Sequence, residues 1–298
     1  MGSRRRHPVL ARLARSPAVI WLVNPHGSVA DSALRAAVDG KIILVTGASY
    51  GVGRATAIRL GGAGAIVLLV ARTVDALNET AARIAESGGE ARVYPTDLAD
   101  PDAVDALAKL ILTEHGHVDV VVSNAGKSIR RAIADSYDRF HDFERTIGVN
   151  YLGPVKLLLA LLPSIRARGE GHLVNVSTIG VQVPPGPRWA AYQASKVAFD
   201  VFFRSTATEI AGEGITASSV YLALVRTRMS APTRTFRGLP GLTAEQAAEL
   251  VCRAIVERPR RISPWWAGAM EAGAVLTRRP WEVISGRLYQ QSTKEQRS

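Results

Sequence analysis

A tyrosine and a lysine stand four positions apart in the segment Tyr192-Gln-Ala-Ser-Lys196. On a helix this spacing puts both side chains on one face. An ammonium group beside a phenol stabilises the phenolate and lowers the phenol pKa from about 10 toward neutrality, as a general acid for a carbonyl oxygen requires. Ser177 ends an upstream apolar run, where its hydroxyl would hydrogen-bond the same oxygen. These three residues predict proton transfer to a substrate carbonyl.

A glycine-rich turn, Thr46-Gly47-Ala-Ser-Tyr-Gly51-Val-Gly53, separates an apolar run from a helical stretch. Glycines at this spacing let the backbone approach a pyrophosphate, and the next helix directs its free N–H groups and positive dipole end at the phosphates. The turn therefore predicts a dinucleotide site, with tight strand-to-helix packing alone as the alternative.

The end of the second apolar run indicates which dinucleotide is bound, because it reads Ala71-Arg72. An acidic side chain there would accept hydrogen bonds from the adenosine ribose, whereas a guanidinium suits a 2′-phosphate. We therefore expect NADP, as NADPH, rather than NAD. The alternative is that Arg72 is a solvated arginine at a strand end.

The elements that must position these residues follow from the apolar pattern. Buried strands are predicted at residues 42–45, 65–70, 92–94, 118–122, 171–176 and 215–222. Helices are predicted at 54–60, 74–86, 100–114, 140–162, 191–211 and 244–257, with a loop or lid at 226–241. Apolar strands alternating with helices indicate an α/β fold, a doubly wound parallel sheet of the Rossmann type. At 298 residues we expect one domain. It comprises a basic leader (1–40), a catalytic domain (41–257) and a basic amphipathic C-terminal extension (258–298).

Composition excludes several classes of protein. Apolar residues make up 47% and charged residues 21% of the chain, which excludes collagen-like and wholly disordered proteins. Most of the net charge of +11 lies in the flanks, with six Arg against two Asp in residues 1–40 and nine Lys or Arg against four Glu in 253–298. No recognition motif accompanies it, so we expect no nucleic-acid partner. Peripheral membrane contact through these flanks, including an anchor at residues 9–23, is an alternative to a loosely docked leader.

The single cysteine, Cys252, can form no disulfide within the chain and lacks companions for zinc. We therefore expect no metal site and a reducing compartment, the cytoplasm. No run reaches the about 18 apolar residues of a membrane span.

Further motifs complete the pattern: Asp97 in Thr-Asp-Leu, Asn124-Ala-Gly126, Asn150 and Val225-x-Thr227. With them, residues 40–257 resemble the short-chain dehydrogenase/reductase family. The resemblance implies that Tyr192 is the acid/base, Ser177 orients the carbonyl, and Lys196 holds the nicotinamide ribose and lowers the tyrosine pKa. Asn150 would complete a water-linked proton relay through the lysine, or would be a helix-interior residue bonded to backbone. A homo-oligomer, dimer or tetramer, is also expected.

The same resemblance implies a set of cofactor contacts, in which Asp97 meets the adenine and Thr227 the nicotinamide carboxamide. The full set is Gly47, Ser49, Tyr50, Gly51, Val52, Gly53, Arg72, Asp97, Asn124, Ala125, Gly126, Tyr192, Lys196, Val225 and Thr227.

Residues 124–131, 136–146 and 224–227 resemble a narrower group, the reductase domain of bacterial fatty acyl-CoA reductases and their actinobacterial relatives. Membership implies NADPH and a hydrophobic acyl or bulky carbonyl substrate. The sequence departs from the family at Leu222-Ala223, where Pro-Gly is usual, and at an inserted segment, Pro184-Pro-Gly-Pro187. The large acyl-CoA reductases also carry an additional domain, where this sequence has a leader of 40 residues.

The leading functional hypothesis is an NADPH-dependent reductase of a fatty aldehyde, acyl-CoA thioester or bulky ketone. A ketoreductase that tailors a polyketide is the alternative, with Trp189 lining a pocket for flat rings. A non-catalytic NADP-binding sensor or scaffold is a third hypothesis, which the intact Ser/Tyr/Lys set disfavours.

Arginines near the expected lid would meet coenzyme A phosphates or remain solvated: Arg130, Arg131, Arg234 and Arg237. For the tryptophans of the extension, Trp265, Trp266 and Trp281, we expect packing or oligomer contact, with a membrane-surface element as the alternative.

Overall fold

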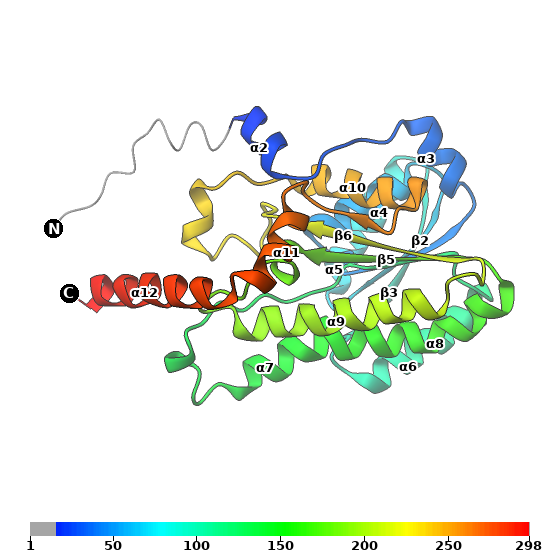
Figure 1. The fold of residues 1–298 in the computed structure, drawn as a ribbon. Coiled ribbons are helices and arrows are strands. Elements are labelled where there is room, and N and C mark those ends of the chain that lie inside the picture. Colours follow the sequence, from blue (N-terminus) through cyan, green and yellow to red (C-terminus); the bar gives the residue numbers. More distant parts are fainter. Residues whose placement is uncertain (1–15, 298) are drawn as a thin grey trace.

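Seven parallel strands form one sheet at the centre of the computed structural model, which describes residues 16–297 (Figure 1). The strands lie in the order β3-β2-β1-β4-β5-β6-β7. Their bounds are β1 (Ile42–Thr46), β2 (Ile66–Ala71), β3 (Glu90–Pro95), β4 (Val120–Ser123), β5 (Gly171–Thr178), β6 (Ile215–Leu222) and β7 (Arg261–Ile262). The order reverses at β1, which pairs with both β2 and β4. Ligands bind doubly wound sheets at the carboxyl edge of such a switch point.

The helices are α2 (Pro17–Val23), α3 (Asp31–Val38), α4 (Gly51–Gly61), α5 (Val74–Glu86), α6 (Pro101–His115), α7 (Phe140–Ile147), α8 (Gly153–Arg168), α9 (Ala190–Glu209), α10 (Ala244–Glu257), α11 (Ala267–Leu276) and α12 (Arg278–Arg297). Helices α6, α8 and α9 cover one face of the sheet, and α3, α4 and α10 cover the other (Figure 1). The predicted doubly wound α/β fold is confirmed.

The central strands β1, β2, β4 and β5 are largely apolar because both of their faces are buried. In β1, Ile43 and Val45 join the core cluster that contains residues of α3, α4, α5 and α10. Leu44 points to the opposite face, into the cluster formed with α6, α8 and α9. Successive strand residues alternate between the two clusters, as a period of two requires.

The helix predicted at 140–162 contains an irregularity at the site. Between α7 and α8 the chain forms one π-helical turn, η2 (Gly148–Leu152), which includes Asn150. π turns inside α-helices occur frequently at functional sites. By length and composition the joined run Phe140–Arg168 would be able to cross a membrane. Its leucines Leu157, Leu158 and Leu161 are buried in the core, as in a core helix of a globular domain.

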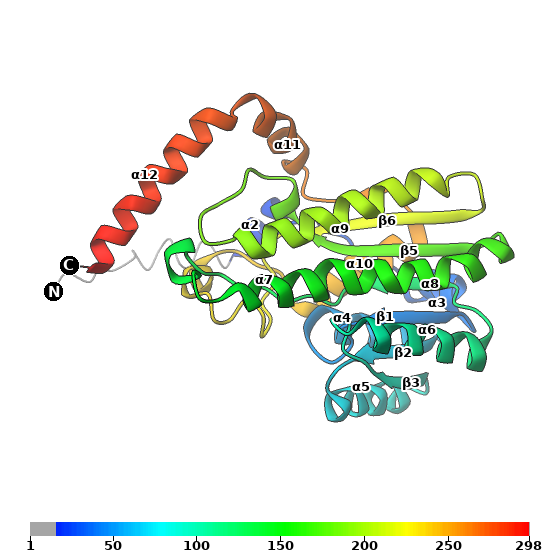
Figure 2. The same ribbon diagram turned by 90° about the horizontal axis from the view of Figure 1, so that it is seen from below.

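The segments outside residues 41–257 also contribute to the fold. Leu34 and Val38 of α3 are fully buried, and β7 pairs with β6 at the sheet edge. Helix α12 extends away from the body of the molecule (Figures 1 and 2). Residues 1–15 of the predicted leader and anchor lie outside the described residues, and the domain boundaries 41 and 257 stay a prediction.

The predicted lid contains one short 3-10 helix, η4 (Arg234–Gly238). Its two ends meet in an isolated bridge between Val225 and Leu242. This bridge fixes the start of the segment close to the carboxyl edge of the sheet.

Candidate active site

The glycine-rich turn has the backbone geometry that the sequence predicts. Gly47 and Gly51 have positive φ angles of 69° and 57°, which L side chains rarely adopt. A Cβ at Gly53 would overlap the Gly47 carbonyl and the Asn124 amide. Helix α4 begins here, and its N-cap residue Tyr50 makes no side-chain cap. The first N–H groups of α4 are thus left to bind a ligand, so the turn fits a pyrophosphate.

Asn124 ties the ends of β1 and β4 together under this turn. Its Nδ2 donates to the Thr46 carbonyl at 2.9 Å, and its backbone N–H donates to Thr46 Oγ1 at 3.0 Å. The Ala125 N–H donates to the same hydroxyl at 3.0 Å. Asn124 and Ala125 therefore hold the shape of the cradle.

Arg72 and Asp97 lie together where β2 and β3 end. Their side chains form an ion pair, with 3.7 Å between Arg72 Nη1 and Asp97 Oδ2. The Arg72 side chain is 67% exposed. Exposed ion pairs contribute little free energy, about 0–1 kcal/mol, so this guanidinium is available to a phosphate.

Tyr192 and Lys196 occupy the first turns of α9, and Lys196 is buried against β5. Lys196 Nζ donates to the Val176 carbonyl at 3.2 Å. Burial lowers the pKa of Lys196 to about 8, while the Asp200 carboxylate acts in the opposite direction. The predicted low phenol pKa is not found: burial raises the pKa of Tyr192, and a hydrogen bond with Thr178 only partly opposes it. Desolvation of the phenolate is the dominant effect, so the phenol holds its proton at neutral pH.

The hydroxyl that meets Tyr192 belongs to Thr178 rather than Ser177. Thr178 Oγ1 also accepts a hydrogen bond from the Gly180 N–H at 3.1 Å. Ser177 Oγ is buried and makes no hydrogen bond with the described residues. The prediction from sequence missed Thr178, although the motif Ser-Thr contains both.

Asn150 uses its side chain to hold backbone. Its Oδ1 accepts from the Lys127 N–H at 2.7 Å, and its Nδ2 donates to the Lys127 carbonyl and to Ser195 Oγ, both at 2.9 Å. Asn150 Oδ1 and Lys196 Nζ lie 3.4 and 3.6 Å from the position of a Cβ at Gly126. The structure thus brings Asn150 beside Lys196, with its amide engaged by backbone as the alternative interpretation expects.

Aromatic rings and arginines surround the entrance to these residues. Trp189 lies 5.9 Å from Tyr192, centroid to centroid, and stacks on Phe236 at 5.7 Å with an interplanar angle of 10°. The Arg130 guanidinium lies 5.9 Å above the Trp189 ring, and that of Arg228 lies 4.2 Å above Tyr50. Cation–π contacts of this kind stabilise a guanidinium beside apolar surface.

The other predicted phosphate-binding arginines are differently placed. Arg131 pairs with the buried Asp142 at 3.0 Å, so it has a structural partner already. The side chains of Arg234 and Arg237 lie outside what the structure describes. Arg188 is a site residue that the sequence did not suggest. It adopts a positive φ of 74°, and Coulomb repulsion from it lowers the pKa of Arg130, after burial as the main cause.

Tryptophans of the extension pack against distant segments. Trp265 and Trp266 donate from Nε1 to the Leu22 and Val23 carbonyls at 2.9 and 3.0 Å. Trp281 Nε1 donates to the Pro185 carbonyl of the inserted segment at 3.3 Å. Each of the three indoles thus makes one hydrogen bond to a distant segment, although Trp265 itself is largely exposed.

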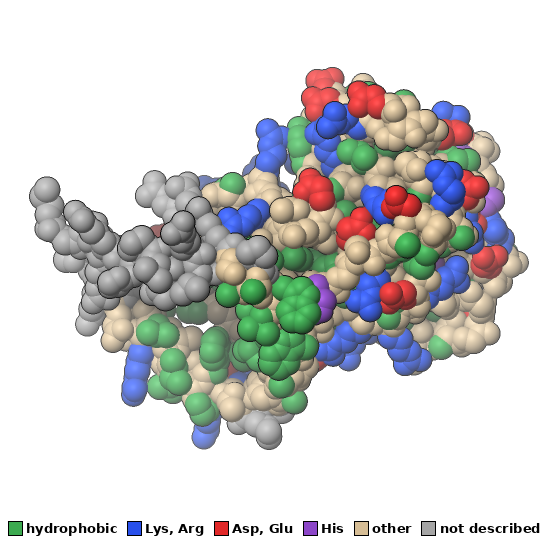
Figure 3. Space-filling model, turned by 90° about the horizontal axis from the view of Figure 1, so that it is seen from above, with side chains coloured by type: hydrophobic (Ala, Val, Ile, Leu, Met, Phe, Trp, Pro, Cys, Tyr) green, Lys and Arg blue, Asp and Glu red, His purple; other side chains and the backbone are tan. Residues whose placement is uncertain are grey.

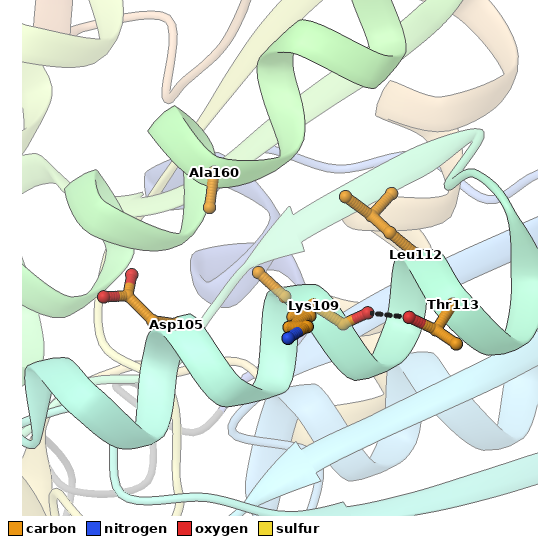
Figure 4. Close-up of a pocket in the computed structure, with 6 residues that line it drawn as sticks. Asp105, Lys109, Leu112, Thr113 and Ala160 are labelled. Atoms are coloured by element: carbon orange, nitrogen blue, oxygen red, sulfur yellow. Dashed lines mark hydrogen bonds between the residues drawn. The ribbon is translucent and has the colours of Figure 1, made fainter.

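A separate depression of about 420 Å³ lies between α6 and α8 (Figure 4). Asp105, Lys109 and Thr113 line it from α6 and Ala160 from α8, and the Thr113 hydroxyl donates to the Lys109 carbonyl. It contains none of the predicted site residues. Within residues 16–297, no group of three or more His, Cys, Asp or Glu side chains is arranged to hold a metal ion.

A glycine cradle at the switch point and a Tyr-Lys pair beside it define a class of proteins. The chain belongs to the short chain dehydrogenase family, a class of oxidoreductases, whose family model matches residues 41–238. Two similar proteins are named fatty acyl-CoA reductase. That of Acinetobacter baylyi is 47% identical over 233 residues, which cover 78% of this chain and 79% of that protein. That of Mycobacterium tuberculosis is 43% identical over 235 residues, covering 79% and 80%.

A solved structure of a metagenomic short-chain oxidoreductase in complex with NADP is also similar. It has a TM-score of 0.65 and 31% identity, and the match covers 74% of this chain and 92% of that one. The resemblance predicted from the motifs is confirmed by these relatives. The match to the Acinetobacter protein covers 79% of that protein's length.

Proposed function

We propose that this protein is an NADPH-dependent reductase of fatty acyl-CoA thioesters and fatty aldehydes, with Tyr192 as the general acid. The observation that carries the proposal is the Tyr192–Lys196 pair on α9, beside Thr178 and the glycine cradle. The names of two relatives, fatty acyl-CoA reductase, support the substrate class.

The cofactor site fits NADPH because the cradle at Gly47, Gly51 and Gly53 has no room for side chains. Arg72 would hold the 2′-phosphate, Lys196 the nicotinamide ribose and Thr227 the carboxamide. NADPH supplies the hydride when bound. The remaining contacts proposed for it are Ser49, Tyr50, Val52, Asp97, Asn124, Ala125, Gly126, Tyr192 and Val225.

The proton comes from the Tyr192 hydroxyl, which burial keeps protonated at neutral pH. As the carbonyl oxygen gains negative charge, this hydroxyl donates its proton to it, and Thr178 Oγ1 donates a second hydrogen bond. Lys196, when charged, stabilises the resulting phenolate. Asn150 would return a proton through ordered water. A thioester reduced in this way releases thiol and aldehyde, and a second turnover reduces the aldehyde to alcohol.

The entrance favours an acyl-CoA because it combines apolar lining with positive charge. A small pocket is lined by Ile129, Ile133 and Phe143 together with Arg188, and also by the ion pair of Arg131 and Asp142. Arg130, which lies over the Trp189 ring, is repelled by Arg188, and an anion next to Arg130 would offset that repulsion. An acyl chain with a phosphorylated carrier satisfies both features.

A ketoreductase acting on flat polyketide rings is the second candidate. The parallel stack of Trp189 and Phe236 would extend onto an aromatic ring of such a substrate. This candidate brings no anion to Arg130.

The test is NADPH oxidation by purified protein with matched panels of long-chain acyl-CoA, fatty aldehyde and aromatic polyketide ketone, with NADH in parallel. We expect turnover of the first two panels, strongly reduced by Tyr192→Phe with NADPH binding retained. Turnover of ring ketones alone would establish the ketoreductase instead. NADPH binding without oxidation by any carbonyl would leave a sensor or scaffold.

We also propose a cytoplasmic enzyme that touches anionic membrane surfaces through an apolar patch of Trp21, Leu22 and Trp265. Trp21 is 57% and Trp265 73% exposed, and hydrophobic side chains gather on this face beside a histidine (Figure 3). The preceding residues 1–15 contain five Arg and no acidic residue. Tryptophan with nearby basic residues is typical of membrane interfaces. In flotation with anionic vesicles, we expect a smaller fraction of the Trp21→Ser/Trp265→Ser variant than of the native protein to float with the vesicles. Equal fractions would contradict the membrane contact.

Self-association is proposed through the outer face of α8 and α9. Leu159, Val197 and Val201 are exposed on these neighbouring helices. Light scattering should show a dimer or tetramer for the native chain and a smaller species for Val201→Arg.

A further inference from the structure

A buried carboxylate lies one helical turn beyond Lys196 on α9. Asp200 is 5% exposed and follows Lys196 by four residues, so the two side chains share a helical face. Neither the motifs nor the reaction proposed above gives it a task. Buried carboxylates are rare unless they are paired, so its presence in this position needs a physical reason.

Charged and polar groups from several elements face Asp200. On α9, Lys196 precedes it, and Arg204 Nη1 lies 3.9 Å from its Oδ2 on the far side. From β6, the Tyr221 hydroxyl donates a hydrogen bond to it. From α11, Glu271 repels it, but Glu271 is itself paired with Arg261 of β7 at 3.0 Å. Asp200 thus lies between two cations along α9.

Beneath these side chains the sheet carries a group of buried polar residues. Asn175 pairs in register with Ser219, and Ser177 pairs with Tyr221, which places all four on one face of β5 and β6. On the same face of β5, Leu173 belongs to the apolar core. Asn175 Nδ2 and Oδ1, Ser177 Oγ and Asp200 Oδ1 are buried without a hydrogen-bond partner among the described residues. Unpaired buried polar atoms lower stability and are few in native proteins, so a group of them calls for a physical reason.

Lys196 needs this environment because its other surroundings favour the neutral amine. The Val176 carbonyl is the neutral acceptor that its Nζ meets. Burial lowers the pKa of Lys196, and the Asp200 carboxylate is the group that acts to raise it. An uncharged lysine would lose its electrostatic effect on the Tyr192 phenolate.

We propose that Asp200, held by Tyr221, is a positioning residue that keeps Lys196 in its ammonium form for ribose binding and for catalysis by Tyr192. The part of this inference that concerns catalysis rests on the proposed function. The effect of Asp200 on the lysine charge does not.

The direct test is an NMR titration of the lysine side chains, labelled at Cε, in the cofactor-free protein. The chain has six lysines, and the Lys196→Met variant identifies the Lys196 signal. In Asp200→Asn, which keeps the shape but removes the charge, we expect Lys196 to lose its proton about one pH unit lower than in the native protein. Asp200→Glu should restore the native titration, and Tyr221→Phe should shift it in the same direction by less.

Arg204→Gln is the matched control, because it removes an exposed charge next to Asp200 but leaves the carboxylate. Loss of a cation cannot lower the pKa of Lys196, so its titration should stay at or above the native one. An unchanged Lys196 titration in Asp200→Asn, with only a lower melting temperature, would show a purely structural role and overturn the inference.

The kinetic test is the pH profile of kcat/KM for carbonyl reduction. The pKa of Tyr192 lies above its ordinary value and that of Lys196 is about 8, so Lys196 loses its proton first and sets the alkaline limb. This limb should move to lower pH in Asp200→Asn and stay in place in Arg204→Gln. If no carbonyl is reduced, the proposed function fails while the NMR result still decides the role of Asp200.

Discussion

Replacing Thr178 with alanine tests which hydroxyl of β5 takes part in the reaction. The Thr178 hydroxyl is hydrogen-bonded with Tyr192, while Ser177 Oγ is buried without a partner among the described residues. Loss of one hydrogen bond to a developing oxyanion costs about 2.7–4 kcal/mol of transition-state stabilisation, or roughly 10²–10³ in kcat. We expect Thr178→Ala to lower kcat by about that factor and to leave the Kd for NADPH nearly unchanged.

Ser177→Ala is the matched control because it removes a hydroxyl from the neighbouring position of the same strand. Its Oγ makes no hydrogen bond with the described residues, so kcat should change by less than about threefold, and stability should not fall. Thr178→Ser retains the hydroxyl and should recover most of the native rate. The assay is NADPH oxidation with a fatty aldehyde at saturating cofactor. A hundredfold loss in Ser177→Ala, with near-native Thr178→Ala, would refute the assignment and return the role to Ser177.

Three further predictions concern the cofactor cradle, the cofactor phosphate and acid stability. Gly53→Ala places a Cβ against the Gly47 carbonyl, so we expect a loss of about 1–3 kcal/mol in unfolding free energy and weakened NADPH binding, measured by thermal unfolding and fluorescence titration. Arg72→Ala should raise the Kd for NADPH by roughly 10–100-fold, since charge-assisted hydrogen bonds contribute about 1.5–3 kcal/mol, with little change for NADH; equal effects on both cofactors would contradict a phosphate contact. Burial lowers the pKa of His172 to about 3, below the ordinary 6.5 that it regains on unfolding, so the unfolded chain binds more protons between these values. Stability should therefore fall by up to about 1.4 kcal/mol per pH unit as the pH drops below 6.5, a dependence that His172→Gln should lose in urea unfolding series.

The sequence predicted the fold and the cradle because both depend on local pattern. Alternating apolar and helical runs define the parallel sheet. The glycine spacing reflects positive φ angles at Gly47 and Gly51 and the lack of room for a Cβ at Gly53. The sequence pattern does not show whether Ser177 or Thr178 meets the Tyr192 phenol, because that depends on how β5 ends relative to α9. The raised pKa of Tyr192 was missed because burial belongs to the packed molecule and not to a four-residue spacing.

Other features of the site have no simple pattern in the sequence. The π turn at Asn150 differs from an α-helix by one extra residue, which apolar periodicity cannot detect over five positions. Strand β7 has two residues, too few to show alternation. In the sequence, Asp200 looks like an ordinary polar residue of a helix. Its contact with Tyr221 of β6, a strand that follows α9, appears only in the folded chain.

The contact between α12 and the inserted segment has a consequence for the evolution of specificity. Trp281 of α12 bonds to Pro185, and the Arg188 guanidinium lies 5.4 Å above Tyr289 of the same helix. One wall of the entrance, next to Trp189, is therefore supported by α12, whereas the residues that we propose for proton transfer lie on β5 and α9. Changes in α11 and α12 would alter which carbonyl compounds enter without disturbing the chemistry. Chimaeras that exchange residues 263–298 among relatives would then inherit substrate range from the donor of that segment and catalytic rate from the donor of the sheet.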